Sequence, residues 1–464
     1  EMDRSLTARQ KFAYGVGHVL NDLCASMWFS YLLVFFHKIL QFSNSMAGNI
    51  LLVGQVADGL ATPFVGYESD KSYFTCKYGK RKSWHLVGKL HRRTICVTLT
   101  FPLLFMYCIG CNNNPEYAQF VYYAPLVVIF QFGWASTQIN HLALIPDLTD
   151  NDGDKVMLNA IRYAFTVFSG IVVYAVAWGI LGIQSNGSDE LSPDDAPNFR
   201  NLVICVVGIG VLFSGIFHVG LKEGRLRRPS LVINGSSNHE RTESYDHDHE
   251  DVSPQYRTVC TNTPALIWYD WFKKPIFYQM ALLYMCTRLV VNLSQVYLTM
   301  FLTDSLHFHK TFIAIVPLVV YVSSFLSALL VRPISKLVRQ EVMYLVGGLF
   351  VISVNVWAYL IPEKSMQIFG YAIGLGIGTS VVLVMSLSMT ARLIGKETGT
   401  GAFVYGAMSL TDKLSNGVAV VIIQYLNPCK CNCPLCATYF RIIMSYVIGG
   451  IMVLAMATMI SIMI

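Results

Sequence analysis

The chain has 464 residues, of which 54% are hydrophobic and only 13% are charged, and its mean hydropathy is +0.49. A typical soluble domain has about 25% charged residues, so this composition excludes an ordinary soluble protein and indicates one that crosses the membrane several times. The net charge of +6 does not indicate nucleic-acid binding, because most Lys and Arg residues fall in alternate loops, a pattern that predicts two cytosolic termini.

Twelve apolar segments are long enough to cross a bilayer as helices. The longest polar interruption, 222–264, follows the sixth segment and is rich in Asn, Ser, His and Asp. This layout predicts an all-α membrane protein with two six-helix bundles, 1–221 and 265–464, joined by a cytosolic loop. Residues 265–274 carry several aromatic side chains and are expected to form an interfacial helix before the second bundle. The expected spans are 12–36, 45–67, 84–110, 118–143, 157–181, 200–221, 275–302, 311–331, 342–361, 367–391, 401–426 and 438–464.

The first expected helix carries Asp22 midway along its length, four residues after His18. An ionised carboxylate at that depth costs about 2.5–3.5 kcal/mol on insertion scales, so such a residue is a functional candidate by default. Residues four apart share a helical face. We predict that Asp22 contacts a cationic or hydroxylic group of a substrate and that His18 relays a proton. The alternative is a hydrogen-bonded polar cluster between helices.

The second expected helix carries Asp58, with Gln55 and Thr62 on the same face. A buried carboxyl group of this kind suits a site for a coupling proton or cation. The alternative is a structural partner for a buried cation in another helix, such as Lys413. The two interpretations are compatible.

Buried cations are expected in the fifth, seventh and eleventh helices, at Arg162, Arg288 and Lys413. Arginine binds a carboxylate through two parallel hydrogen bonds, whereas lysine acts as a point charge. Buried acids together with buried bases suit a zwitterionic ligand, the acid for its amine and the base for its carboxylate. The alternative is charge neutralisation without a ligand. The neutral candidates for contacts to the ligand are Gln138 in the fourth helix, Asn292 in the seventh and Tyr405 in the eleventh.

Two features fall in loops on the side opposite the termini. Asn186 begins an Asn-Gly-Ser sequence and is a glycosylation candidate. Four cysteines precede the last helix, and on a non-cytosolic side disulfides are favoured over zinc or free thiols. No cofactor or metal is predicted, and an enzyme is the least favoured class, because the chain lacks a nucleotide-binding loop, a zinc-hydrolase helix and a nucleophile elbow. The four cysteines are Cys429, Cys431, Cys433 and Cys436.

Motifs in both halves resemble those of the glycoside–pentoside–hexuronide cation symporters, a family within the major facilitator superfamily. Longer runs, at 18–28, 54–58, 130–138, 161–166 and 401–406, are similar to a branch of that family that imports cysteine into lysosomes and melanosomes. The motifs that carry the first resemblance are Tyr14-Gly-x-Gly with Asp22, Asp58 with Pro63-x-x-Gly66, Gly79-Lys80-Arg81-Lys82 with Trp84, and Lys413.

The resemblance implies a substrate contact at Asp22 and a cation site at Asp58. It also places the family's helix 5 arginine on Arg162 and its helix 11 lysine on Lys413. The chain departs from the family at two positions, where Thr62 and Gln138 stand in place of acids. Because a hard cation such as sodium prefers several charged oxygen ligands, these departures favour proton-linked or uncoupled transport over sodium coupling.

The resemblance therefore implies a monomeric secondary transporter that moves cysteine from the cytosol into lysosomes or melanosomes by alternating access. The lipid bilayer and a coupled proton are its other expected partners. One alternative is a lysolipid or sugar symporter of the same branch. Another, of a different class, is a membrane scaffold or sensor that transports nothing.

Overall fold

The computed structural model is built from helices, and the residues that it describes contain no β-strand. The expected all-α fold is thus confirmed. The described residues are 6–71, 82, 93–110, 114–149, 152–183, 191–221, 268–335, 337–394, 401–428 and 434–464. The central loop expected at 222–264 lies outside them.

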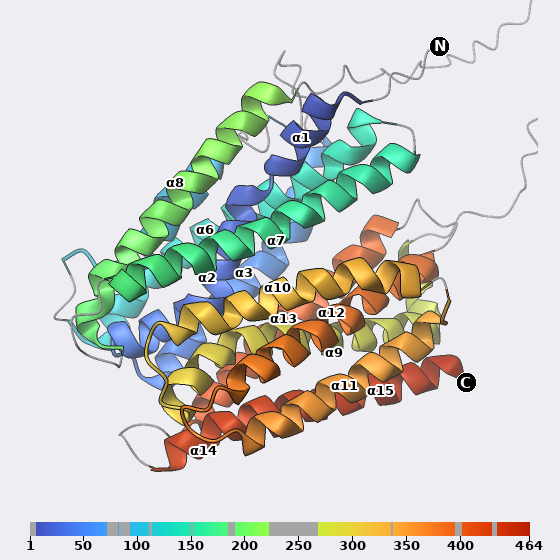
Figure 1. Cartoon of the computed structure of the whole chain (residues 1–464). Helices are drawn as coiled ribbons and strands as arrows, with labels where there is room; N and C mark the ends of the chain where they lie inside the picture. The colour runs from blue at the N-terminus through green and yellow to red at the C-terminus, as the bar shows by residue number, and fades with distance from the viewer. Residues whose placement is uncertain are drawn as a thin grey trace, which may run out of the picture.

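The helices form two bundles, one from each half of the chain (Figure 1). The halves meet where α3 packs against α13, α2 against α9, and α7 against α10. The first half consists of α1 (Ala8–Val16), α2 (Val19–Val34), the π-helix η1 (Phe35–Ile39), α3 (Asn44–Lys71), α5 (Arg93–Leu103), α6 (Glu116–Leu148), α7 (Asp152–Ile183), η2 (Pro193–Asp195) and α8 (Ala196–Gly220). The second half consists of η3 (Trp268–Lys273), α9 (Pro275–Met300), the π-helix η4 (Phe301–Ser305), α10 (Phe312–Ile334), α11 (Gln340–Leu360), α12 (Gln367–Ile394), α13 (Gly401–Leu426), α14 (Pro434–Ile442), η6 (Ile443–Val447) and α15 (Ile448–Met463).

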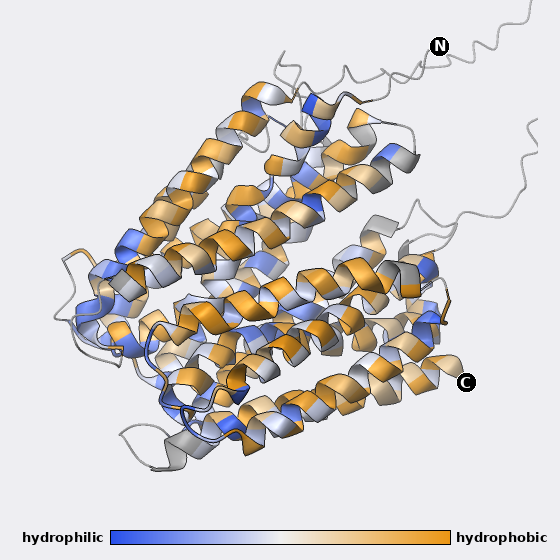
Figure 2. Ribbon diagram, in the orientation of Figure 1, coloured by the Kyte–Doolittle hydropathy of each residue, from blue (hydrophilic) through white to orange (hydrophobic). Residues whose placement is uncertain are grey.

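In the described part of the chain, nine helical segments are long and apolar enough to cross a membrane. Every one of the twelve expected spans overlaps a helix, and the three outside the nine are those of α3, α5 and α13. The polar residues Asp58 of α3 and Asp412 and Lys413 of α13 lower the hydropathy of two of these helices. These two helices pack against each other, while apolar residues cover much of the outer faces of both bundles (Figure 2).

Both ends of the described chain lie at the same end of the molecule, because α1 begins and α15 finishes there (Figure 1). We call this the terminal end and the opposite one the distal end. The π-helices η1 and η4 and the turns after them belong to the distal end, since α2 and α9 run away from the terminal end.

An internal repeat relates the two halves. In each, the first long helix ends in a five-residue π-helix, and the next residue donates a backbone hydrogen bond to the first residue of that π-helix, at 3.0 Å and 3.1 Å. The following residue, Gln41 or His307, has a positive φ of 56° or 50°, which is uncommon outside glycine. Counting back from this shared turn, Asp22 and Arg288 occupy equivalent positions of α2 and α9.

Candidate functional site

The first membrane helix is interrupted between α1 and α2, next to the expected site. Gly17 follows α1 there, and a Cβ atom at this position would lie 2.4 Å from the ring of Phe217 in α8. Asp22 consequently falls in the first turn of α2, where the positive end of the helix dipole favours a carboxylate. Broken helices whose ends face the middle of the membrane are a common basis of transporter sites.

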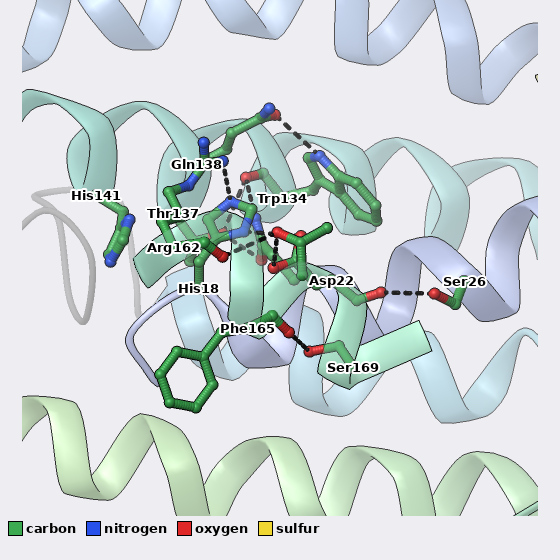
Figure 3. Close-up of polar contacts among 12 residues, drawn as sticks. His18, Asp22, Ser26, Trp134, Thr137, Gln138, His141, Arg162, Phe165 and Ser169 are labelled. Carbon is green, nitrogen blue, oxygen red and sulfur yellow. Dashed lines mark hydrogen bonds and ion pairs between the residues drawn. The ribbon is translucent and has the colours of Figure 1, made fainter. Parts of the chain in front are cut away.

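Asp22 belongs to a chain of polar contacts between α2 and α7 (Figure 3). Its Oδ2 accepts a hydrogen bond from the Thr166 hydroxyl at 2.9 Å. Its Oδ1 lies 3.0 Å from Nδ1 of His18, although not with hydrogen-bond geometry. Nη2 of Arg162 lies 3.2 Å from Nε2 of His18. Because a guanidinium can only donate, Nε2 is the acceptor, so the proton of a neutral His18 ring is on Nδ1 and faces Asp22.

Arg162 has unused hydrogen-bonding capacity. Its Nε is buried and has no hydrogen-bond partner among the described residues. A buried donor without a partner costs about 1–3 kcal/mol, and more when the group is charged. A ligand carboxylate that accepted from this group would recover part of that cost.

Gln138 lies on α6 beside this chain of contacts (Figure 3). Its Oε1 accepts a hydrogen bond from the indole Nε1 of Trp134 at 3.1 Å. The Trp134 carbonyl in turn accepts from Nδ2 of Asn21 at 3.1 Å, and Oδ1 of Asn21 accepts from the Thr137 hydroxyl at 2.5 Å. These contacts fix α6 against α2 on the side of the cluster away from α7.

Arg288 and Asn292 of α9 belong to a second cluster, in the other half. Nε of Arg288 donates to Oδ2 of Asp412 in α13 at 3.0 Å. Oδ1 of Asp412 accepts from Nδ2 of Asn416 at 2.6 Å and from Nδ2 of Asn292 at 3.4 Å. Asp412 is buried, whereas 30% of the Arg288 side chain is exposed. The charges are reversed relative to the first cluster, since here the base is on the first helix of the half and the acid is on the fifth.

Asp58, Thr62 and Lys413 form a third cluster, where α3 and α13 join the two halves. Nζ of Lys413 lies 2.7 Å from Oδ1 of Asp58 and donates to the Thr62 hydroxyl at 2.8 Å. The pairing of Asp58 with Lys413 is therefore observed. The adjacent Asp412 and Lys413 serve different clusters because consecutive helical residues point about 100° apart.

The other predicted residues are not part of these clusters. Tyr405 lies about two turns before Lys413 on α13, and 42% of it is exposed. Asn186 and three of the cysteines, Cys429, Cys431 and Cys433, lie outside the described residues, and Cys436 belongs to α14. Within the described ranges, no three His, Cys, Asp or Glu residues lie together in a way that could hold a metal ion.

Sequence reasoning did not assign a role to Asp412 or Thr166, which hold Arg288 and Asp22 respectively. Helical spacing could have indicated one of them, because Thr166 is four residues after Arg162 and so shares its face. The pairing of Asp412 with Arg288 has no comparable signal, since it joins residues more than a hundred positions apart.

Comparison with known proteins gave three findings. Residues 13–233 match the family model described as MFS/sugar transport protein. The chain is 46% identical to human "Major facilitator superfamily domain-containing protein 12" over 97% of its own length and 92% of that protein, and 21% identical to an uncharacterized symporter of Synechocystis over 91% and 86% of the two chains. Among solved structures, it resembles a D-xylose-proton symporter with a TM-score of 0.66 and 14% identity, covering 97% and 96% of the two chains. This last likeness concerns the fold alone.

Proposed function

The chain belongs to the major facilitator superfamily, among the relatives of major facilitator superfamily domain-containing protein 12, and from this premise we propose that its substrate is cysteine. The protein is a multi-pass membrane transporter of the secondary type. In this proposal it acts as a monomer and moves cysteine by alternating access from the cytosol into lysosomes or melanosomes. The excess of Lys and Arg in alternate loops supports cytosolic termini, so the terminal end would face the cytosol and the distal end the lumen.

The observation that carries the substrate class is the pairing of opposite charges within one cluster. Asp22 offers a carboxylate oxygen to an amine, and Arg162 offers the buried Nε that lacks a partner among the described residues. An amino acid carries both complementary groups. The protein has three clusters of charged side chains inside the bundle, and burying a charge is costly unless an opposite charge compensates it. An amino acid carries charges of both signs that can do so, whereas a neutral sugar carries none.

In the proposed mechanism, Asp22 binds the amine and Arg162 binds the carboxylate. His18 lies between them and can pass a proton between Asp22 and the ligand, because both of its ring nitrogens face polar partners. In this proposal Arg288 contributes to the same substrate site from the repeat-related position of α9, held in place by Asp412 and flanked by Asn292. Gln138 and Tyr405 are proposed to line the substrate site.

We assign coupling to Asp58, Thr62 and Lys413. The Lys413 ammonium already neutralises Asp58 and bonds Thr62, so these groups offer a sodium ion a single carboxylate and no second charge. Transport is therefore proposed to be proton-linked or uncoupled. Movement of a proton onto Asp58 would free Lys413 and loosen the contact between α3 and α13.

The test is flux through purified full-length protein in proteoliposomes. We expect uptake of cysteine in preference to cystine, xylose and lysophosphatidylcholine. A pH gradient should change the uptake rate if transport is proton-linked and leave it unchanged if transport is uncoupled. A sodium gradient should have no effect in either case. Arg162→Lys keeps the charge but removes the forked geometry, and it should reduce kcat/KM for cysteine about tenfold or more. Asp154→Asn, about two turns before Arg162 on α7 and not part of the cluster, is the control. Flux of xylose or the lysolipid alone would replace the proposed substrate, and no flux of any compound would favour a scaffold or sensor.

A further inference from the structure

Two ion pairs join the halves of the protein at the distal end. Nζ of Lys38, in η1, lies 2.8 Å from Oδ1 of Asp304, in η4. Nζ of Lys310, just before α10, lies 2.9 Å from Oδ1 of Asp195, in η2. The side chains of the second pair are only 3% and 5% exposed, so that pair is almost completely desolvated.

Ion pairs at the terminal end follow a different pattern, because each stays within one half. Lys11 of α1 lies 2.7 Å from Asp154 of α7, and Arg392 of α12 contacts Glu341 of α11. Across the described residues, the ion pairs that cross between the halves are thus the two distal ones and the mid-depth pair of α3 and α13. Among the described ion pairs, those at the terminal end therefore do not cross between the halves, whereas those at the distal end do.

The Lys38–Asp304 pair also has a special place in the internal repeat. Each residue is the fourth of its π-helix, so the two positions are equivalent in the two halves. A contact between equivalent positions lies on the axis that relates the repeats. Separation of the halves at the distal end would therefore break this pair directly.

A second layer of contacts lies between these ion pairs and the Asp22 cluster. Nε2 of Gln295 in α9 is within 3.2 Å of three hydroxyl oxygens, which come from three other helices. The Tyr321 ring packs over Gly170 of α7, where a Cβ atom would lie 2.5 Å from it. Contacts between the halves thus occur in two layers between Asp22 and the distal end. The three hydroxyl groups belong to Ser30 of α2, Tyr174 of α7 and Tyr321 of α10.

We propose that Lys38–Asp304 and Lys310–Asp195 form the distal gate of the transporter. They hold the halves together at the distal end while the substrate site is open to the terminal end, and both pairs break when substrate leaves on the distal side. Contacts that exist in only one of two states bias the equilibrium toward that state. The inference rests on the proposed transport function but not on the identity of the substrate.

Charge reversal tests the gate. Lys38→Asp places two carboxylates together, and Asp304→Lys places two ammonium groups together, so each should favour a protein open at the distal end. Because the two positions are equivalent, the double variant K38D/D304K restores an opposite-charge pair and should restore the original balance. Lys11→Asp and the swap K11D/D154K are matched controls within one half. The Lys11 hydrogen bond lowers the pKa of Asp154, so the control pair stays ionised at the neutral pH of the measurement.

The readout is the distance between the halves, measured by electron–electron double resonance in the full chain. For each end, an amino acid with a ketone side chain is introduced at two positions, one in each half, and carries the spin labels. The native cysteines then stay in place. Exposed positions in opposite halves are available at both ends. They are Ile109 with Met366 at the distal end and Val219 with Leu337 at the terminal end.

Each single reversal should raise the ratio of distal-open to distal-closed protein about threefold or more, with a shorter distance at the terminal end. The swap should return both distributions to those of the wild type, and the controls should leave them unchanged. The neutral variants Lys38→Met and Asp304→Asn replace the reversals if those fail to elute as a single monodisperse peak. The proposal is overturned if reversals leave the distances unchanged, if the swap does not restore them, or if the controls shift them equally. A shift without cysteine flux would support the gate and contradict the proposed substrate.

Discussion

At the scale of single residues, the buried charges of this protein are compensated by partners from other helices. Asp58 has Lys413 and Asp412 has Arg288, while Asp22 lies beside His18 of its own helix and accepts a hydrogen bond from Thr166 of α7. A charge in a low-dielectric interior is tolerable when it is paired and hydrogen-bonded, and removing one partner strands the other. The site can therefore hold several ionisable groups in a bundle that is otherwise apolar.

Replacing Lys413 should test how much this pairing contributes to stability. Lys413→Met keeps the length of the side chain but leaves Asp58 without its cation, and we expect a loss of about 3–5 kcal/mol in the free energy of unfolding. The double variant K413M/D58N removes both charges and should recover most of that loss. Thermal unfolding in detergent measures both. Equal losses in the single and double variants would mean that the ionised pair contributes little.

Thr166 should prove important for substrate affinity although it carries no charge. Thr166→Val keeps the shape of the side chain and removes the hydrogen bond to Asp22, which changes the placement of the carboxylate. A hydrogen bond to a charged group is worth about 1.5–3 kcal/mol, so KM for cysteine should rise roughly tenfold or more. Ser169→Ala is the control, because the Ser169 hydroxyl bonds the Phe165 carbonyl in the same helix. Similar KM values for the two variants would remove Thr166 from the site.

At the scale of the helices, close packing depends on particular glycines. Gly376 of α12 faces α10, and a Cβ atom there would lie 2.4 Å from the carbonyl oxygen of Val320. The Ser324 hydroxyl donates to the Gly376 carbonyl at 2.9 Å, across the same contact. Small residues let helix backbones approach in membranes, where no difference in hydrophobicity drives the helices together.

Gly376→Ala should accordingly destabilise the second half. The added methyl group would clash with the Val320 carbonyl as well as with the Ser323 hydroxyl, so we expect a loss of about 1–3 kcal/mol, seen as a lower melting temperature. Gly450→Ala in α15 is the control, because in the described part of the chain no atom outside the adjoining turns of α15 lies within 4 Å of the added methyl group. That control should be neutral or stabilising by up to about 1 kcal/mol, as expected for alanine in a helix. Equal melting temperatures for the two variants would contradict the close contact of α10 and α12.

At the scale of the whole molecule, the two halves are held together by contacts between their helices. Three helix pairs, α3 with α13, α2 with α9 and α7 with α10, connect them along the interface. The ion pairs and the Gln295 network add specific contacts toward the distal end. The halves can therefore associate without depending on a covalent link between α8 and η3.

A cut between the halves should leave transport intact. A protease site introduced within 222–267, followed by complete cleavage, should give two fragments that co-purify and carry cysteine within about twofold of the uncut rate. The expectation follows from the extent of helix contact across the interface. A chain with the same inserted site but no protease treatment is the control. Dissociation of the fragments in mild detergent would show that the link is needed and that the helix contacts across the interface do not hold the halves together.

Much of the fold and part of the site could be predicted from the sequence. The twelve apolar segments each overlap a helix, because hydropathy is a property of a continuous stretch and the bilayer fixes the length that it needs. Asp22, Asp58, Arg162, Arg288 and Lys413 could be singled out for the same reason, since a charge inside such a stretch is costly wherever the helix packs. The close approach of Phe217 of α8 to Gly17, beside the break between α1 and α2, could not be predicted, because it joins residues 200 positions apart in the chain.

The sequence by itself determined which stretches are long and apolar enough to span the membrane, which residues in them are charged, and which of those share a face of one helix. Only the tertiary structure decided which charges meet. Arg288 pairs with Asp412 of α13, and Lys38 of η1 pairs with Asp304 of η4 at the distal end. The physical reason is that helical periodicity fixes the direction of a side chain around its own axis, while the neighbour in that direction is set by the packing of helices far apart in the chain.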